Sequence, residues 1–168
     1  MSGKRTVILT NDEIERKIKR MAWEIYENNH QASQLILLGI AKNGNHIAAS
    51  IAKTLSEISN IEIKTGQIDL DKTKSFDSEV TLKCNVNIGG ETVIMVDDVL
   101  NSGKTMLTCM RPVIDQKPAK IQTAVLANRN HKAFPVKADI VGISLATTLQ
   151  EHIWFEIEPN DEMIVFLT

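Results

Sequence analysis

Two neighbouring carboxylates and a short polar turn lie close together along this chain and could act on one ligand. Asp97 and Asp98 follow an apolar run, and the turn Ser102-Gly103-Lys104-Thr105 comes soon after them. The turn offers backbone N–H groups, hydroxyls and an ammonium, and a turn of this kind at the start of a helix binds phosphate. Carboxylates beside a phosphate site suit a ligand that also carries hydroxyls or Mg²⁺. These residues therefore predict a site for a ribose phosphate.

The apolar run at residues 93–96 indicates how the carboxylates are positioned. A strand that is apolar throughout is typical of the middle of a parallel sheet, and open α/β sheets bind ligands beyond the carboxyl ends of such strands. Alternatively, Asp97 and Asp98 only end a strand and cap the next helix. A P-loop is excluded because the earlier glycine of that motif is missing before Gly103. A phosphoacceptor receiver domain is disfavoured because its acidic pair would lie near the N-terminus.

The composition is typical of one folded domain. The chain has 168 residues, 43% hydrophobic and 24% charged, which are ordinary globular values. The net charge of −2 gives no overall reason to expect nucleic-acid or anionic-membrane binding. Cys84 and Cys109 are too few and too far apart for a disulfide framework or a zinc site. No signal peptide and no apolar segment of membrane-spanning length is found, so the expected location is the cytoplasm.

Alternating helical and strand patterns predict the elements that carry these residues. Thr10 and Glu13 form a capping box, and the apolar spacing that follows predicts a helix ending near residues 28–30. The run at 35–40 predicts a buried strand, and a second helical pattern covers 47–55. A third helix is expected at 106–114, and strand-like segments at 61–63, 68–70 (separated by Gly66), 80–84, 121–127, 140–143, 153–157 and 163–167.

This order of elements predicts an α/β fold. We expect a doubly wound, mostly parallel sheet with helices on both faces and a small C-terminal strand-rich cap. No linker or internal repeat divides the chain, so residues 1–168 are expected to form one domain. The polar stretch at 71–79 is predicted to be a mobile loop.

A second strand-to-helix connection has the sequence Gly39-Ile40-Ala41-Lys42-Asn43-Gly44. Because it follows an apolar strand, as the acidic pair does, both connections should open on the same edge of the sheet. By itself this hexapeptide is an ordinary strand-to-helix turn. Its position ahead of the acidic pair is what favours a second part of the same site.

The segment from 93 to 105 resembles the ribose-phosphate signature of type I phosphoribosyltransferases. That signature has an apolar strand, two acidic residues, two apolar residues and then a Thr/Ser-Gly-x-Thr turn. The resemblance implies that Asp97 and Asp98 are catalytic and hold the ribose hydroxyls, directly or through Mg²⁺. It also implies that the 5-phosphate of the donor, 5-phosphoribosyl-1-pyrophosphate, is bound by Asn101, Ser102, Gly103, Lys104 and Thr105.

The connection at 39–44 resembles the pyrophosphate loop of the same family. The resemblance implies that pyrophosphate is bound by Ala41, Lys42, Asn43 and Gly44, and that the Ala41–Lys42 peptide is cis. A cis bond without proline costs about 3 kcal/mol, so it is expected only where function requires it. The loop at 71–79 would close over the donor, with Lys72 or Lys74 as its cation.

The region from 125 to 142 is similar to the pyrimidine operon attenuator / uracil phosphoribosyltransferase family. That family has Asp-Arg-Gly-His where this chain has Asn128-Arg129-Asn130-His131, and it shares the later Ala138-Asp139-apolar-Val-Gly pattern. The resemblance implies uracil as the acceptor, a hood for the base over residues 128–168, and a homodimer or higher homo-oligomer. The implied base-binding residues are Asn128, Arg129, Ile140 and Val141.

Two alternatives to a uracil transferase stay open. One is a nucleotide-sensing regulator of pyrimidine genes that binds mRNA with little catalysis, for which Arg129, Lys132 and Lys137 could form a basic face. The other is a 6-oxopurine (hypoxanthine, guanine or xanthine) transferase. The purine family has a Lys at the place of Asn128, an aromatic residue at that of Ile140 and an Asp at that of Asn101, so this acceptor is disfavoured.

One aromatic cluster can be interpreted in two ways. His152 lies beside Trp154 and Phe155, and these side chains could stack on a base or form a dimer contact. Aromatic residues in a strand pattern are more commonly part of a hydrophobic core, and that is the expectation here.

Overall fold

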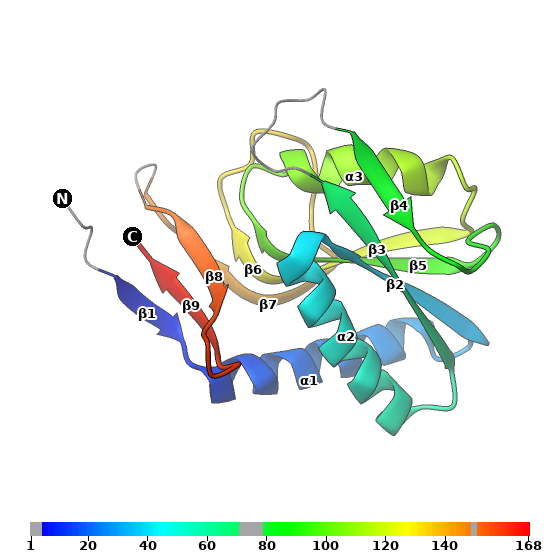
Figure 1. The fold of residues 1–168 in the computed structure, drawn as a ribbon, viewed down its shortest axis with the longest axis horizontal. Coiled ribbons are helices and arrows are strands. Elements are labelled where there is room, and N and C mark those ends of the chain that lie inside the picture. The colour runs from blue at the N-terminus through cyan, green and yellow to red at the C-terminus, as the bar shows by residue number, and fades with distance from the viewer. Residues whose placement is uncertain (1–4, 71–78, 149–150) are drawn as a thin grey trace.

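The computed structural model describes residues 5–70, 79–148 and 151–168. Its helices are α1 (Asn11–Asn29), α2 (Ala41–Ile58) and α3 (Lys104–Ile114). Its strands are β1 (Thr6–Leu9), β2 (Gln34–Ile40), β3 (Glu62–Leu70), β4 (Val80–Lys83), β5 (Thr92–Leu100), β6 (Lys120–Arg129), β7 (Ile140–Leu145), β8 (Ile153–Ile157) and β9 (Met163–Leu167), as Figure 1 shows. Within the described ranges, no helix has the length and apolar character needed to cross a membrane.

The main sheet has the strand order β4-β3-β2-β5-β6-β7. Its strands run parallel except β4, which pairs antiparallel with β3. Strand β3 pairs with one edge of β2, and β5, which comes later in the chain, pairs with the opposite edge of β2. The carboxyl ends of β2 and β5 are therefore neighbours at a switch point of the topology, where open α/β sheets form their ligand sites.

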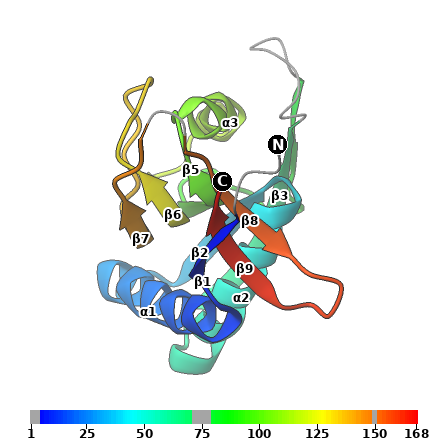
Figure 2. The same cartoon turned by 90° about the vertical axis from the view of Figure 1, so that its left-hand side faces the viewer.

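Both faces of the main sheet are covered, which explains why its central strands are apolar throughout. In β2, Leu35 and Leu37 point into the core that α1 and α2 cover, and Ile36 and Leu38 point into the core under α3. Figure 2 shows α1 and α2 on one side of the sheet and α3 on the other. The predicted doubly wound sheet is confirmed.

The strand-rich cap is a separate three-stranded sheet with the order β1-β9-β8, antiparallel throughout. The guanidinium of Arg5 lies 3.7 Å from the centre of the Phe166 ring and 3.0 Å from the carboxylate of Glu156. The predicted C-terminal cap is therefore present, but it also contains a strand from the N-terminal end, which the sequence pattern did not indicate. Four residues are too short a run to reveal a strand by periodicity.

Two predicted local features differ in the structure. Strand β3 runs through Gly66 without a break because its backbone pairs continuously with β2 from Glu62 to Ile68. Helix α2 begins at Ala41 directly after β2, so most of the strand-to-helix connection expected at 39–44 forms the first turn of the helix, which extends the helical pattern of 47–55 toward the N-terminus. Of the loop predicted at 71–79, residues 71–78, including Lys72 and Lys74, lie outside the described residues.

The predicted capping box at the start of α1 is confirmed. The Glu13 carboxylate accepts hydrogen bonds from the backbone N–H and the hydroxyl of Thr10, both at 2.9 Å. These bonds, the backbone one first, hold the pKa of Glu13 below its ordinary value of 4.5. The apolar side of the same helix is buried against the sheet at Ile14, Ile18 and Ile25.

We expect Glu13→Ala to lower the melting temperature at pH 7, because the charged carboxylate is the form that these hydrogen bonds favour. A depressed folded-state pKa stabilises the protein above the ordinary pKa, and this contribution is lost as the pH falls through the lower folded-state value. Thermal melts from pH 7 to pH 3 should therefore show the variant and the parent converging in acid. Glu27→Ala, at an exposed site on the same helix, is the control; a pH-independent difference for Glu13→Ala would contradict the assignment.

Candidate active site

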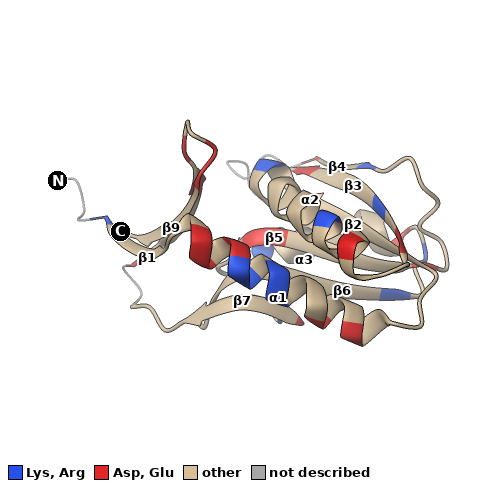
Figure 3. Ribbon diagram, turned by 90° about the horizontal axis from the view of Figure 1, so that it is seen from below, with Lys and Arg blue, Asp and Glu red and all other residues tan. Residues whose placement is uncertain are grey.

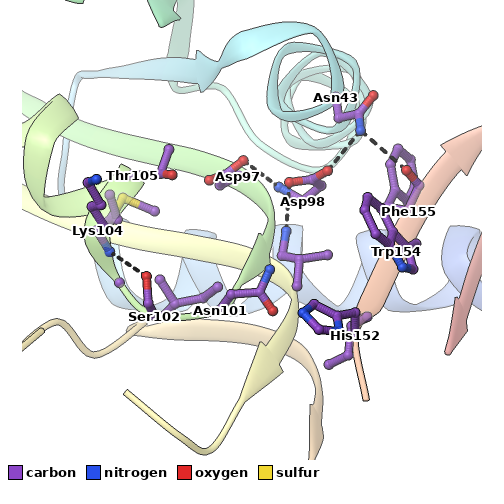
Figure 4. Close-up of a pocket in the computed structure, with 15 residues that line it drawn as sticks. Asn43, Asp97, Asp98, Asn101, Ser102, Lys104, Thr105, His152, Trp154 and Phe155 are labelled. Atoms are coloured by element: carbon purple, nitrogen blue, oxygen red, sulfur yellow. Dashed lines mark hydrogen bonds between the residues drawn. The ribbon is translucent and has the colours of Figure 1, made fainter. Parts of the chain in front are cut away.

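A cavity of about 290 Å³ lies at the switch point, beyond the carboxyl end of β5 (Figure 4). Its wall combines the end of β5, the turn that follows it, the first turn of α3, one side chain of α2 and the strand β8. The lining residues are Asn43, Asp97, Asp98, Val99, Leu100, Asn101, Ser102, Gly103, Lys104, Thr105, Met106, His152, Ile153, Trp154 and Phe155. The cavity thus brings together the predicted acidic pair and all five residues of the predicted phosphate turn.

The acidic pair is nearly enclosed by protein and is held by the backbone. Asp97 is 1% exposed and Asp98 is 8% exposed. The N–H of Asp98 donates to Oδ1 of Asp97 at 2.9 Å, and the N–H of Val99 donates to Oδ1 of Asp98 at 2.8 Å. Each carboxylate is therefore oriented by the residue that follows it, and both line the same cavity.

Asn43 connects three elements of the site. Its side-chain Nδ2 donates to Oδ2 of Asp98 at 2.8 Å and to the backbone carbonyl of Phe155 at 3.3 Å. One amide thus joins the start of α2 to the acidic pair on β5 and to strand β8 of the small sheet. Pyrophosphate binding was predicted for Asn43, and in the structure its side chain donates to Asp98; the predicted role stays a prediction.

The predicted phosphate turn has the geometry of an anion site at a helix N-terminus. Gly103 is the N-cap residue of α3 and has a positive φ of 87°. The hydroxyl of Ser102 accepts a hydrogen bond of 3.3 Å from the N–H of Lys104. Backbone N–H groups at the first turn of a helix have no partner within the helix, and the helix dipole adds to their attraction for an anion.

Two of the other predicted pyrophosphate residues lie beside a second hollow. Ala41 and Lys42 line a space of about 590 Å³ together with Asn45, Gln67, Asp69, Leu70, Glu79 and Thr81. The prediction of a cis Ala41–Lys42 peptide is wrong, because no cis peptide bond is found among the described residues. The chain turns from β2 into α2 by a positive φ of 53° at Ala41 instead.

Gly44 allows α2 to begin very close to the strand that carries the acidic pair. A Cβ atom at this position would lie 2.5 Å from the carbonyl oxygen of Val96 and 3.2 Å from Cα of Asp97. Backbone atoms cannot move aside as a flexible side chain can, so only glycine fits here. Without this approach, Asn43 would not be within hydrogen-bond distance of Asp98.

The predicted base-binding residues do not line the cavity. Ile140 is fully buried in the core that α1 covers, and as the first residue of the edge strand β7 it pairs with Ala124 of β6. Val141 follows it along β7. Arg129 donates to the Thr147 hydroxyl and the Thr148 carbonyl, both at 2.7 Å. The amide of Asn128 contacts Ser144 and Lys132.

Strand β8 supplies the wall that the sequence did not predict. His152, Ile153, Trp154 and Phe155 line the cavity opposite the acidic pair and the turn. The Trp154 side chain is 49% exposed, and its Nε1 donates to the hydroxyl of Thr168 at 2.9 Å. The sequence feature that could have indicated this wall is the close succession of His152, Trp154 and Phe155, which was instead predicted to be part of the hydrophobic core. Phe155 is indeed buried, whereas Trp154 and His152 are exposed.

Comparison with known proteins gives one consistent family. The pattern described as the Phosphoribosyl transferase domain matches residues 5–162. The chain is 36% identical over 169 residues to the "Bifunctional protein PyrR" of Deinococcus deserti, covering 96% of this chain and 92% of that protein. It is 32% identical over 163 residues to the "Pyrimidine operon regulatory protein" of Lactococcus lactis, covering 94% and 92%. A hypoxanthine phosphoribosyl transferase structure from Trypanosoma cruzi has a TM-score of 0.78 at 17% identity, covering 98% of this chain and 93% of that chain. That last likeness concerns the fold.

We expect Gly44→Ala to lower the free energy of unfolding by about 1–3 kcal/mol, the usual cost of overpacking, because α2 must move away from β5. Urea denaturation measures this change. Lys53→Ala, on the exposed side of the same helix, should change stability by less than about 0.5 kcal/mol. Equal stability of Gly44→Ala and the parent would show that the close approach is not required.

Proposed function

As the chain belongs to the phosphoribosyl transferase domain family, we propose that it transfers the 5-phosphoribosyl group from 5-phosphoribosyl-1-pyrophosphate to uracil and releases pyrophosphate. The transferase class follows from the family, whereas the acceptor and the residue roles are proposals. The observation that supports them most is the cavity in which Asp97, Asp98 and the N-terminus of α3 face strand β8. One side of this cavity suits a ribose phosphate, and the other side suits a flat ring.

The donor's 5-phosphate would be bound by the turn before α3. The backbone N–H groups of Ser102, Gly103, Lys104 and Thr105 lie at the positive end of the helix dipole. The N–H of Asn101 and the hydroxyls of Ser102 and Thr105 would complete the set. Holding the phosphate at a rigid helix end positions the anomeric carbon for attack.

The acidic pair would act on the ribose. Loss of pyrophosphate from the anomeric carbon builds positive charge on the ring, and carboxylates fixed nearby favour that charge in a site that excludes water. Asp97 and Asp98 are fixed in this sense, since each accepts a backbone hydrogen bond from the next residue. Carboxylate oxygens have more than one lone pair each, so those of Asp97 and Asp98 could also accept hydrogen bonds from the 2′ and 3′ hydroxyls.

The donor set around the acidic pair fits Mg²⁺. This cation is usually held by one or two carboxylates together with substrate oxygens and water. Asp97 and Asp98 would provide the carboxylates, and among the described residues no cluster of three or more His, Cys, Asp or Glu offers a cage made by protein alone. When bound with the donor, Mg²⁺ supplies Lewis-acid stabilisation of the leaving oxygens.

The pyrophosphate would extend toward the start of α2. Lys42 supplies a cation beside the hollow that Ala41 also lines. The first N–H groups of α2, from Ala41 to Gly44, lie at a second positive helix end, close to the end of β2. This role for the four residues stays a prediction.

The acceptor base would lie against β8, and this replaces Asn128, Arg129, Ile140 and Val141 as the proposed base site. Trp154 offers an exposed aromatic ring, and β8 pairs with β9 on one side only, so its other edge can offer backbone groups. Uracil is proposed from the resemblance to the pyrimidine family and from relatives such as the "Pyrimidine operon regulatory protein". Ile140 is buried and does not line the cavity, so its side chain is not part of the proposed base site.

A second candidate function is a regulator that keeps the nucleotide site as a sensor and binds mRNA. The names of the relatives support it. Arg129 and Lys132, from the basic face expected on sequence grounds, both donate to protein oxygens. Helix α1 carries a second group of cations, Arg16, Lys17 and Arg20, which line a hollow of about 550 Å³ together with Glu13. Arg20 also donates to the Gly142 carbonyl at 3.0 Å, and Figure 3 shows basic and acidic segments mixed along this helix. A homodimer and a cytoplasmic location remain parts of the proposal.

The reaction is tested by pyrophosphate release from the donor with Mg²⁺, scanned over uracil, hypoxanthine, guanine, xanthine, adenine and orotate. We expect release with uracil, and a loss of about 10²-fold or more in kcat for Asp97→Asn with Asp98→Asn, because charge stabilisation of this kind has that size. Asp115→Asn, exposed after α3, is the control. Release with a 6-oxopurine alone would correct the acceptor, and donor binding without any release would favour the regulator.

The position of the base is tested by Trp154→Ala. Stacking of a base on an aromatic ring is worth about 1–3 kcal/mol, so the KM for the base should rise roughly tenfold while the KM for the donor changes little. Trp23→Ala is a matched control, because Trp23 on α1 is also 49% exposed and does not line the cavity. An unchanged KM for the base would place the acceptor elsewhere.

A further inference from the structure

The segment that follows β6, residues 130–136, contacts the phosphate turn directly. The backbone N–H groups of Ala133 and Phe134 both donate to the carbonyl oxygen of Ser102, at 3.1 and 3.0 Å. A carbonyl oxygen has two lone pairs, so this one is fully used. The carbonyl belongs to the peptide that joins Ser102 to Gly103, within the turn proposed to bind the 5-phosphate.

The same segment packs against the N-cap residue of α3. A Cβ atom at Gly103 would lie 3.3 Å from the carbonyl oxygen of Phe134 and 3.4 Å from Cβ of Val136. Gly103 also needs its positive φ of 87°, which side chains disfavour. The backbone of the turn is therefore in contact with residues 130–136 as well as with the helix that it begins.

Lys132 joins this segment to the ends of two strands of the main sheet. Its Nζ lies 3.3 Å from the Leu100 carbonyl and 2.5 Å from Oδ1 of Asn128, and it also contacts the Arg129 carbonyl. The amide of Asn128 continues to β7, where its Nδ2 donates to the Ser144 hydroxyl at 3.3 Å. Leu100 is the last residue of β5, and the phosphate turn follows it directly. The ammonium of Lys132 therefore binds the backbone immediately before that turn.

We propose that Lys132 is a positioning residue that fixes the phosphate turn to the carboxyl ends of β6 and β7 and thereby sets the affinity for the donor. An ammonium has three hydrogens, and three protein oxygens lie around it. It is not among the residues that line the cavity. The geometry thus favours an action through the turn over a direct contact with the base or with RNA. This inference rests on the proposed function.

The environment of Lys132 agrees with such a role. Burial, and to a lesser extent the charge of Arg129, lowers the pKa of the Lys132 ammonium from its ordinary value of 10.5. A partly buried ammonium is costly unless oxygen atoms replace its water. The carbonyls of Leu100 and Arg129 and the amide of Asn128 provide that replacement, so the cation and the two strand ends hold one another in place.

The test compares Lys132→Met, which keeps the aliphatic stem, with Lys132→Arg and with Lys137→Met, an exposed lysine of the same region. Calorimetry measures the Kd of ribose 5-phosphate, and kinetics measures the KM of each substrate. For Lys132→Met we expect the Kd and the donor KM to rise roughly tenfold or more, as for lost hydrogen bonds to a charged group. The base KM should change less than about twofold, Lys132→Arg should recover part of the loss, and Lys137→Met should resemble the parent.

Hydrogen exchange adds a readout that does not depend on turnover. In Lys132→Met, amides of residues 101–105 should exchange faster, while those of 41–44 remain as in the parent. If Lys132→Met does not fold, Asn128→Leu removes the side-chain acceptor of Lys132 and should raise the donor Kd in the same direction. Unchanged donor affinity, or a loss confined to the base, would overturn the proposal. Failure of the parent protein to bind ribose 5-phosphate would instead overturn the proposed function.

Discussion

The close approach of helix α2 to strand β5 is the contact on which the rest of the site depends. At Gly44 there is no room for even a Cβ atom, since it would lie 2.5 Å from the Val96 carbonyl. This distance brings the first turn of α2 level with the last residues of β5. As a result, Asn43 reaches Asp98, and the positive ends of α2 and α3 both face the carboxyl edge of the sheet at its switch point.

The small sheet completes the site without belonging to the main sheet. Strand β8 pairs with β9, which pairs with β1, so the hood is held by strands from both ends of the described chain. The side-chain amide of Asn43 links it to the acidic pair, because Asn43 donates to both Asp98 and the Phe155 carbonyl. A ligand that binds between β5 and β8 would therefore contact both sheets.

The phosphate turn is supported by a segment that is distant in sequence. The turn ends β5 and begins α3, yet its Ser102 carbonyl is held by Ala133 and Phe134, and its departure point at Leu100 by Lys132. A short loop rich in polar backbone groups needs such partners, because backbone groups without hydrogen bonds are costly when buried. The basic character of residues 129–137, which suggested a nucleic-acid surface, is in part explained by this structural use.

Most of the elements, and the residues of the part of the cavity proposed to bind the donor, could be predicted from patterns that are local in the chain. The apolar run into Asp97-Asp98 and the turn to Thr105 are contiguous, so their chemistry and their place at a strand end could be predicted from neighbours in the chain. The doubly wound sheet followed from the order of helical and strand patterns, which depend on local side-chain spacing. The prediction of a cis Ala41–Lys42 peptide was inferred from a resemblance and is wrong, because the backbone turns there through a positive φ at Ala41.

The residues that face the acidic pair from the other side of the cavity could not be predicted in this way, because long-range strand pairing places them there. Ile140 and Val141 lie on β7, next to β6, but they are the first two residues of that strand, at the end opposite to its carboxyl end. His152 and Trp154 line the cavity because β8, which is not a strand of the main sheet, pairs with β9 in the small sheet. Such pairing joins residues that are far apart in the chain, and no periodic pattern of side chains records it.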